Sequence, residues 1–298
     1  MILYKNMPKI YIIFFIFIFT HQAHALMIIK HNLSASENEN SLSYEYAILK
    51  LILDKSKDKY GEYQLVKSIK MSQTRAFHEL SKVDSEVNII ASMTSIEREK
   101  KSSPIRFCLF KGLLGVRIPI VLKSEKERIE KIKTYSDLKK LSAGQVFDWP
   151  DTHILDANNM NVIKATIYTG LFPMLVLKRF DIFPLGALEV YQIEKEHEAK
   201  YNLSVIEKWA IAYPTGYYFF VNKKNKILEE RLNYGFINAI KDGSFDEVFN
   251  RYNNNFLQIA KLENRKIFKL KNPILPKTTV FKDKNIWHPL IMKEFSEF

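Results

Sequence analysis

Cysteine is almost absent from this sequence, and its absence excludes one kind of stabilisation. Cys108 is the only cysteine among 298 residues, so the chain can form no internal disulfide. The residue lies in the apolar segment Arg106-Phe107-Cys108-Leu109-Phe110, which favours a small buried side chain. A catalytic thiol needs a neighbourhood that stabilises the thiolate, and the sequence does not indicate one.

Several sequence signatures of catalytic and metal sites are also missing. The chain has no H-E-x-x-H motif, no phosphate-binding P-loop and no G-x-S-x-G motif. Acidic residues and a histidine cluster at positions 194–198, but a metal site would need ligands that converge in space. We interpret this cluster as a solvated charged loop. We therefore expect no metal, no cofactor and no catalytic residue.

Long apolar runs are scarce as well, and the one that stands out is at the start of the chain. Residues 10–19 (IYIIFFIFIF) follow Lys5 and Lys9 and precede Ala23-His24-Ala25. Positive charge, a short apolar core and an A-x-A sequence are typical of a secretory signal peptide. The run is well short of the roughly 18 residues that indicate a membrane-spanning helix. We expect residues 1–25 to be removed; an uncleaved signal anchor is the alternative.

Export places the mature chain, beginning at Leu26, in the periplasm. Because Leu26 is not a cysteine, we expect no lipid anchor. The formal net charge of +12 comes from 45 basic and 33 acidic residues that are mixed along the chain. Such a charge can indicate nucleic-acid binding. The predicted export would place the chain away from nucleic acid, so we expect no nucleic-acid partner.

The first third of the chain alternates between strand and helix patterns. Residues 26–33, 63–69 and 87–93 read as strands, because they are short and mostly apolar. Residues 43–55 and 72–81 have apolar positions at helical spacing. This alternation predicts an α/β fold with a largely parallel sheet and helices on its faces.

The same pattern continues to the end of a second lobe, without a linker. Pro119 and Pro214 mark candidate crossings between lobes, and residues 134–142 read as a helix that Ser136 could cap. Residues 209–221 predict two short strands around Pro214-Thr215-Gly216. The expected ranges are 26–118 for the first lobe, 119–211 for the second, 212–256 for the return to the first, and 257–298 for a C-terminal tail that packs on a lobe in extended form.

One group of candidate binding residues follows the third predicted strand. Ligands bind beyond the carboxyl ends of strands in parallel sheets, which places Thr94, Ser95 and Arg98 near a ligand. The planar fork of an arginine matches a carboxylate. The alternative is a surface arginine paired with Glu97 or Glu99.

Further candidates come from the second half of the chain. Asp148, Trp149 and Asp151 form an unusual polar and aromatic segment that could hold a polar or cationic ligand, with Trp149 as a stacking face. The alternative is a turn anchored by Trp149 whose acidic residues cap the next element. Glu189 follows another apolar segment and is either a ligand contact or a solvated residue.

The chain resembles bacterial extracellular solute-binding proteins of family 3, the polar amino-acid-binding type. Met93-Thr94-Ser95-Ile96-Glu97-Arg98 is similar to that family's Ser/Thr-rich loop ending in T-x-x-R, and Arg179-Phe180-Asp181 to its G-R-x-D-like segment. The resemblance covers residues 26–252 and leaves out the tail. It implies a two-lobe periplasmic binding protein-like type II fold, in which each lobe is a mixed sheet flanked by helices and a hinge joins the lobes.

The resemblance also implies roles for single residues. In amino-acid binders the matching arginine holds the ligand carboxylate, which implies that role for Arg98, with Thr94 and Ser95 beside it. Thr152 matches the Ser or Thr that begins a helix in the second lobe, where ligand anions meet backbone N–H groups. Glu189 is the nearest substitute for the aspartate that binds the ligand ammonium.

The expected function is periplasmic binding of a small polar solute, amino-acid-like or another small anion or zwitterion, for ABC-type transport or sensing. The partners would be the solute and an inner-membrane permease or sensor, and we expect a monomer without enzymatic activity. One alternative is a periplasmic dehydratase or lyase with Glu189, Asp151 or His153 as acid or base. Another is a protein-interaction module whose cleft is filled by the tail.

Overall fold

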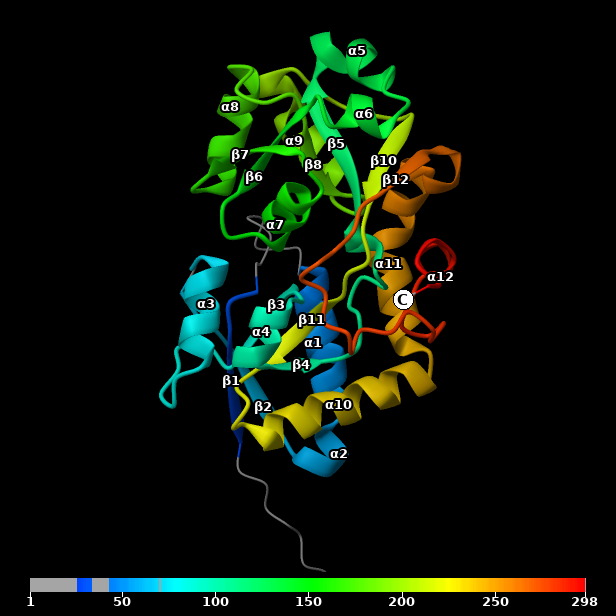
Figure 1. Ribbon diagram of the computed structural model, residues 1–298. Coiled ribbons are helices and arrows are strands. Elements are labelled where there is room, and N and C mark those ends of the chain that lie inside the picture. The colour runs from blue at the N-terminus through cyan, green and yellow to red at the C-terminus, as the bar shows by residue number, and fades with distance from the viewer. Residues whose placement is uncertain (1–25, 34–42, 70, 298) are drawn as a thin grey trace, which may run out of the picture.

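The computed structural model describes residues 26–33, 43–69 and 71–297 as two α/β lobes, one above the other in Figure 1. The predicted signal peptide, residues 1–25, lies outside the described residues. No helix in the described part of the chain is both long and apolar enough to span a membrane.

The first lobe is built on a five-stranded mixed sheet with the order β2-β1-β3-β11-β4. Its first three strands run parallel, and the returning β11 runs antiparallel to β3 and β4. The central strands β3 and β11 are mostly buried, as their continuous apolar sequences predict. The strands are β1 (Met27–His31), β2 (Tyr63–Lys67), β3 (Ile89–Met93), β4 (Ser103–Ile105) and β11 (Tyr217–Val221).

Helices cover this sheet and supply most of its core. α1 and α10 pack on each other with apolar residues at helical spacing, among them Ile48, Ile52, Leu232 and Phe236, all 0% exposed. The helices of this lobe are α1 (Tyr44–Asp54), α2 (Lys57–Tyr60), α3 (Gln73–Leu80), α4 (Ile96–Lys101), α10 (Lys226–Lys241) and α11 (Ser244–Ala260).

The second lobe has a sheet with the order β12-β10-β5-β8, and β9 also pairs with β5. A two-stranded parallel sheet, β6-β7, joins it through a bridge between Ala143 and Ile182. The strands are β5 (Val116–Leu122), β6 (Ser142–Val146), β7 (Asn161–Ala165), β8 (Phe183–Gly186), β9 (Leu203–Val205), β10 (Trp209–Ala212) and β12 (Lys266–Lys269). The helices are α5 (Lys126–Glu130), α6 (Tyr135–Leu138), α7 (Pro150–Ala157), α8 (Leu171–Val176) and α9 (Val190–Tyr201).

The chain passes between the lobes before β5 and again between β10 and β11. β5 begins at Val116, so the chain has already joined the second sheet when it reaches Pro119. Pro214 lies in the second crossing, as expected. The two crossings touch: Tyr213 N–H donates to the Gly115 carbonyl at 3.1 Å. A Cβ at Gly115 would lie 2.3 Å from the Tyr213 oxygen, so this contact requires glycine.

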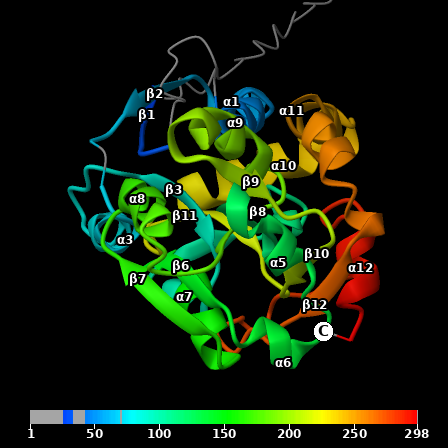
Figure 2. The same ribbon diagram turned by 90° about the horizontal axis from the view of Figure 1, so that it is seen from above.

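The tail connects the lobes instead of covering one of them in extended form. β12 pairs in parallel with β10 of the second lobe. The chain then returns to the first lobe, where the Ile274 carbonyl accepts a hydrogen bond from Ile96 N–H at 2.9 Å. The short helix α12 (Pro289–Glu294) follows, and Trp287 and Ile291 lie against Gly112. Figure 2 shows β12 and α12 together at one side of the molecule.

Two local predictions were wrong. Residues 194–198 lie within the helix α9 and not in a loop. Only Val190 of α9 is buried, so the helix lacks the apolar periodicity by which it could be detected. Thr134, not Ser136, caps α6, because the Thr134 hydroxyl accepts from Asp137 N–H at 3.1 Å.

Candidate functional site

A cavity of about 150 Å³ lies between the two lobes, and we call it the interlobe cavity. α1, α3 and the ends of β3 and β11 supply one wall, while β5, the start of α7 and the residue before α9 supply the other. Its lining residues are Glu45, Gln73, Met93, Phe110, Leu114, Arg117, Trp149, Pro150, Asp151, Glu189 and Tyr217.

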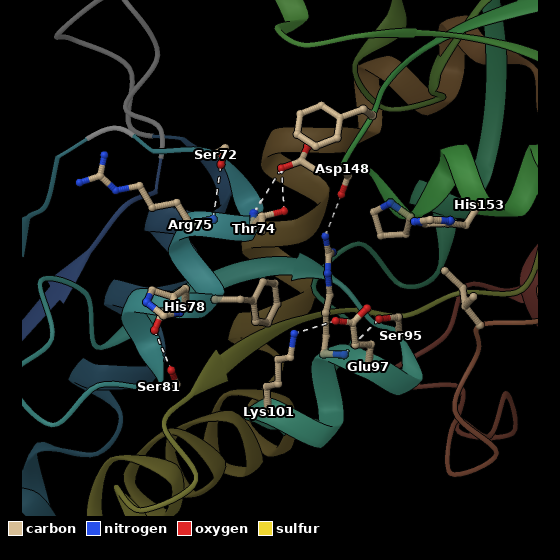
Figure 3. Close-up of a pocket in the computed structure, with 15 residues that line it drawn as sticks. Ser72, Thr74, Arg75, His78, Ser81, Ser95, Glu97, Lys101, Asp148 and His153 are labelled. Atoms are coloured by element: carbon tan, nitrogen blue, oxygen red, sulfur yellow. Dashed lines mark hydrogen bonds and ion pairs between the residues drawn. The ribbon is translucent and has the colours of Figure 1, made fainter.

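A larger opening of about 1010 Å³, the outer groove, lies between α3, α4 and α7 (Figure 3). Ile274 of the tail reaches this groove, but no described tail residue lines the interlobe cavity. Pro150 lines both openings. The groove is lined by Ser72, Thr74, Arg75, Phe77, His78, Ser81, Ser95, Glu97, Arg98, Lys101, Phe147, Asp148, Pro150, His153 and Ile274.

Arg98 lines the outer groove and turns its guanidinium toward its own lobe. One terminal nitrogen donates to Ser92 Oγ at 2.7 Å and to the Met93 carbonyl at 2.8 Å. The other donates to Gln73 Oε1 at 2.6 Å. Burial lowers the pKa of Arg98 to about 10, which leaves it charged at neutral pH. Arg98 forms no ion pair with Glu97 or Glu99; Lys101 bonds to Glu97, and Arg106 to Glu99.

Asp148 connects the lobes. One oxygen of its carboxylate accepts from the backbone N–H and from the hydroxyl of Thr74, each at 3.2 Å (Figure 3). Thr74 lies in the first turn of α3, where unpaired N–H groups and the helix dipole favour an anion. The Asp148 carbonyl also accepts from Arg98 at 3.4 Å. The segment after β6 therefore closes against α3.

A charged network lies at the base of the interlobe cavity, centred on Arg117. This arginine, 6% exposed, forms ion pairs with Asp151 at 2.7 Å and with Glu189 at 3.6 Å. Its Nε donates to the Tyr213 hydroxyl at 2.9 Å, and that hydroxyl donates to Asp151. Burial opposes the charged form, but Asp151, Tyr213 and Glu189 together raise the pKa of Arg117 above its ordinary value.

Two further carboxylates face the same cavity. Burial raises the pKa of Glu189 although Arg117 and the Gly186 N–H act in the opposite direction. Its side chain lines the cavity and is 46% exposed. Burial also raises the pKa of Glu45, and the charge of Glu189 adds to that shift.

The residues predicted from the sequence divide into three groups. Trp149, Asp151 and Glu189 line the interlobe cavity, and Ser95, Arg98 and Asp148 line the outer groove. Thr94 and Thr152 line neither, because their hydroxyls donate to Glu99 at 2.5 Å and to the Val146 carbonyl at 2.7 Å. Ser95 also caps α4 by accepting from Arg98 N–H.

Sequence reasoning missed Glu45, Gln73, Arg117 and Tyr213. Arg117 had a visible signal, because it is the one charged residue within the apolar segment GLLGVRIPIVL. A charge in a strand buried on both faces requires a partner. Glu45 had no such signal in the sequence, because the first turn of a helix is an ordinary position for an acidic residue.

The described residues include no group of three or more His, Cys, Asp or Glu side chains arranged to hold a metal ion. His153 lies on the outer groove and is exposed. Cys108 is fully buried, as predicted, and burial raises the pKa of its thiol to about 11.

Comparison with solved structures identifies the fold. The chain matches an ancestral arginine-binding protein bound to arginine with a TM-score of 0.57 and 16% identity, over 77% of this chain and 99% of that one. It matches a Salmonella typhimurium periplasmic binding protein with high arginine specificity with a TM-score of 0.58 and 12% identity, over 76% and 99% of the two chains. It also matches a histidine kinase sensor domain similar to periplasmic binding proteins, with a TM-score of 0.56 and 12% identity over 77% and 96%.

Comparisons of the sequence with known protein families and with curated proteins give no match. The predicted two-lobe α/β fold is confirmed, and so is the resemblance to amino-acid-binding periplasmic proteins at the level of the fold.

Proposed function

We propose that this protein binds a small polar solute between its lobes in the periplasm and carries out no covalent chemistry on it. One observation carries the proposal: the interlobe cavity is lined by charged and aromatic side chains from both lobes. Such cavities with few convergent polar groups are the usual form of small-molecule sites. The matched structures include periplasmic proteins that bind arginine.

The contacts between the lobes support a closure mechanism. Asp148 reaches Thr74 across the cleft by side-chain bonds that separation of the lobes would break. The crossings at Gly115 and Tyr213 lie side by side, where a hinge would rotate. A solute that contacts both walls would stabilise the closed state by its own binding energy.

We propose distinct roles for the eight residues predicted from the sequence. Trp149, Asp151 and Glu189 form the second-lobe wall of the solute site. Arg98 and Asp148 close the cavity toward the outer groove. Ser95, Thr94 and Thr152 do not contact the solute in this proposal. They fix the backbone of the segments that carry Arg98 and Asp148.

We further propose that the closed state is recognised by a permease or a sensor and that the protein acts as a monomer after removal of its signal peptide. The matched structures include the binding protein of an amino acid ABC transporter and a sensor domain of a histidine kinase. The enzymatic alternative names Glu189, Asp151 or His153 as acid or base. Asp151 is paired with Arg117 and Tyr213, and His153 lies on the outer groove, whereas Glu189 lines the interlobe cavity. Turnover of a bound solute would therefore favour the enzymatic alternative.

Tryptophan fluorescence can test the proposal, because only Trp149 of the three tryptophans lines the interlobe cavity. Residues 26–298 would be titrated with amino acids, small amines and small organic acids. We expect one class to change the fluorescence and raise the melting temperature. Trp149→Phe should abolish the fluorescence change, and Trp209→Phe should retain it. Absence of both effects with every class would contradict the proposal, and so would turnover of the bound solute.

A further inference from the structure

We infer that the solute of the interlobe cavity is a small organic ammonium ion that needs no carboxylate, held between Glu45 of the first lobe and Glu189 of the second. This inference rests on the proposed function. It departs from the amino-acid ligand that the sequence resemblance implies.

The charges that line the cavity do not balance. Three carboxylates, those of Glu45, Asp151 and Glu189, face one guanidinium, that of Arg117. Asp151 neutralises Arg117 directly, at 2.7 Å, while Glu189 is farther away, at 3.6 Å. The described residues that line the cavity therefore carry an excess of negative charge, and a bound cation would restore neutrality.

Glu45 has no partner on another residue in the part of the chain that the structure describes. Its carboxylate accepts a hydrogen bond from its own backbone N–H, and no hydrogen bond or ion pair joins it to another described residue. It stands at the start of α1, opposite the wall that carries Glu189, and the two charges repel each other. An ammonium group between the two carboxylates would donate a hydrogen bond to each of them. Its positive charge would thereby remove their repulsion.

Among the described residues that line the cavity, no cation is free to meet a carboxylate. The Nε and both terminal nitrogens of Arg117 are directed to Tyr213, Asp151 and Glu189. Arg98 does not line the cavity, and Gln73 stands between, accepting from Arg98 at 2.6 Å. A ligand carboxylate in this cavity would therefore meet acidic groups without a cation to compensate.

Size and wall chemistry point to the same ligand class. A volume of 150 Å³ corresponds to about five water molecules at their share of liquid volume. Phe110, Trp149 and Tyr217 line the cavity, and aromatic faces attract organic cations. A compact amine fits within this volume.

Ethanolamine and L-serine are matched probes, because serine is ethanolamine with a carboxylate added. Glycolate is the anion without the amine. Calorimetric titration of the full mature chain at pH 8 should show binding of ethanolamine, at least tenfold weaker binding of serine, and none of glycolate. Binding of ethanolamine should weaken as the pH is lowered to 5, because burial raises the pKa of both Glu45 and Glu189 and protonation removes the charges that hold the cation.

Glu45→Gln tests the assigned residue, with Glu97→Gln as the matched control. Glu97 lies on the outer groove and pairs with Lys101. We expect Glu45→Gln to weaken ethanolamine binding at least tenfold and Glu97→Gln to leave it unchanged. Because the raised pKa of Glu45 means that its ionised form destabilises the folded state, Glu45→Gln should melt no lower than the parent at pH 8.

The outcomes separate this inference from the function on which it rests. Binding of serine or glycolate in preference to ethanolamine would overturn the ammonium assignment and leave solute binding standing. Ethanolamine binding that is unaffected by Glu45→Gln, or a melting temperature lowered by that change, would overturn the role of Glu45. Failure of amines, amino acids and organic acids alike to bind would overturn both.

Discussion

Arg117 shows how a single buried charge organises the space around it. A guanidinium in a buried strand is tolerated only with partners, and it has Asp151, Tyr213 and Glu189. These partners come from α7, from the end of β10 and from the position before α9. The arginine therefore fixes three elements of the second lobe around the cavity.

Removing the closest partner of Arg117 should be costly. Asp151→Ala leaves a guanidinium that is 6% exposed without its nearest counter-charge. We expect a loss of about 3–5 kcal/mol in the free energy of unfolding, measured with urea. Glu127→Ala removes the 88%-exposed partner of Lys131 and should cost below about 1 kcal/mol. Equal losses in the two variants would contradict the structural role of Asp151.

Candidate site residues that follow a strand could be predicted from the sequence. Site residues that other elements bring to the same cavity by packing could not. Trp149, Asp151 and Glu189 were predicted because each follows an apolar segment in an α/β pattern, and all three line the interlobe cavity. Glu45 reaches the cavity only because α1 begins at its rim, a fact of packing. The sequence also left open whether Arg98 serves a ligand, and its bonds to Ser92, Met93 and Gln73 appear only in three dimensions.

At the scale of elements, the tail joins the two lobes. β12 pairs with β10 of the second lobe, and Ile274 accepts a hydrogen bond from Ile96 of the first lobe. After β12 the tail packs Trp287, 3% exposed, between Phe281 and Gly112. Gly112 has a φ of +81°, and a Cβ there would lie 2.9 Å from Trp287 and Ile291. Glycine thus permits both the turn and the contact with the tail.

Trp287 should anchor the tail to the first lobe. Trp287→Ala removes a large buried side chain and should lower the free energy of unfolding by about 3–5 kcal/mol. Lys284→Ala, at an exposed position of the same segment, should change it by about 0.5 kcal/mol or less. Urea unfolding of both variants provides the measurement. A similar small change in each would show that the tail is not anchored by Trp287.

Regular elements were predicted where their patterns were strong. The strands at the centre of the first lobe and the helices α1 and α3 follow clear apolar patterns, and the structure confirms them. α9 was missed because a helix with a single buried residue has no such pattern. The role of β12 depends on a partner strand, β10, that lies more than fifty residues earlier, which local sequence does not show.

At the scale of the whole molecule, the contact between Asp148 and Thr74 bears on how far the lobes separate. Each hydrogen bond of this kind contributes about 1 kcal/mol, which corresponds to a factor of about five in a two-state ratio. Asp148→Ala should therefore shift the solute-free protein toward an open form. Small-angle X-ray scattering should show a larger radius of gyration than in the parent chain.

Asp156→Ala is the control for this measurement, because Asp156 pairs with Lys164 within the second lobe. Its radius of gyration should equal that of the parent. An unchanged radius in Asp148→Ala would show that the tail and the crossings alone hold the lobes together.

The position of β12 also has a consequence for the order in which the molecule is made. β10 lies between β5 and β12, so one of its edges stays uncovered until residues 266–269 have left the ribosome. All four residues of β10 are buried in the finished sheet. An open apolar strand edge is a template for aggregation. The nascent second lobe therefore keeps this edge of β10 open during the whole synthesis of α10 and α11.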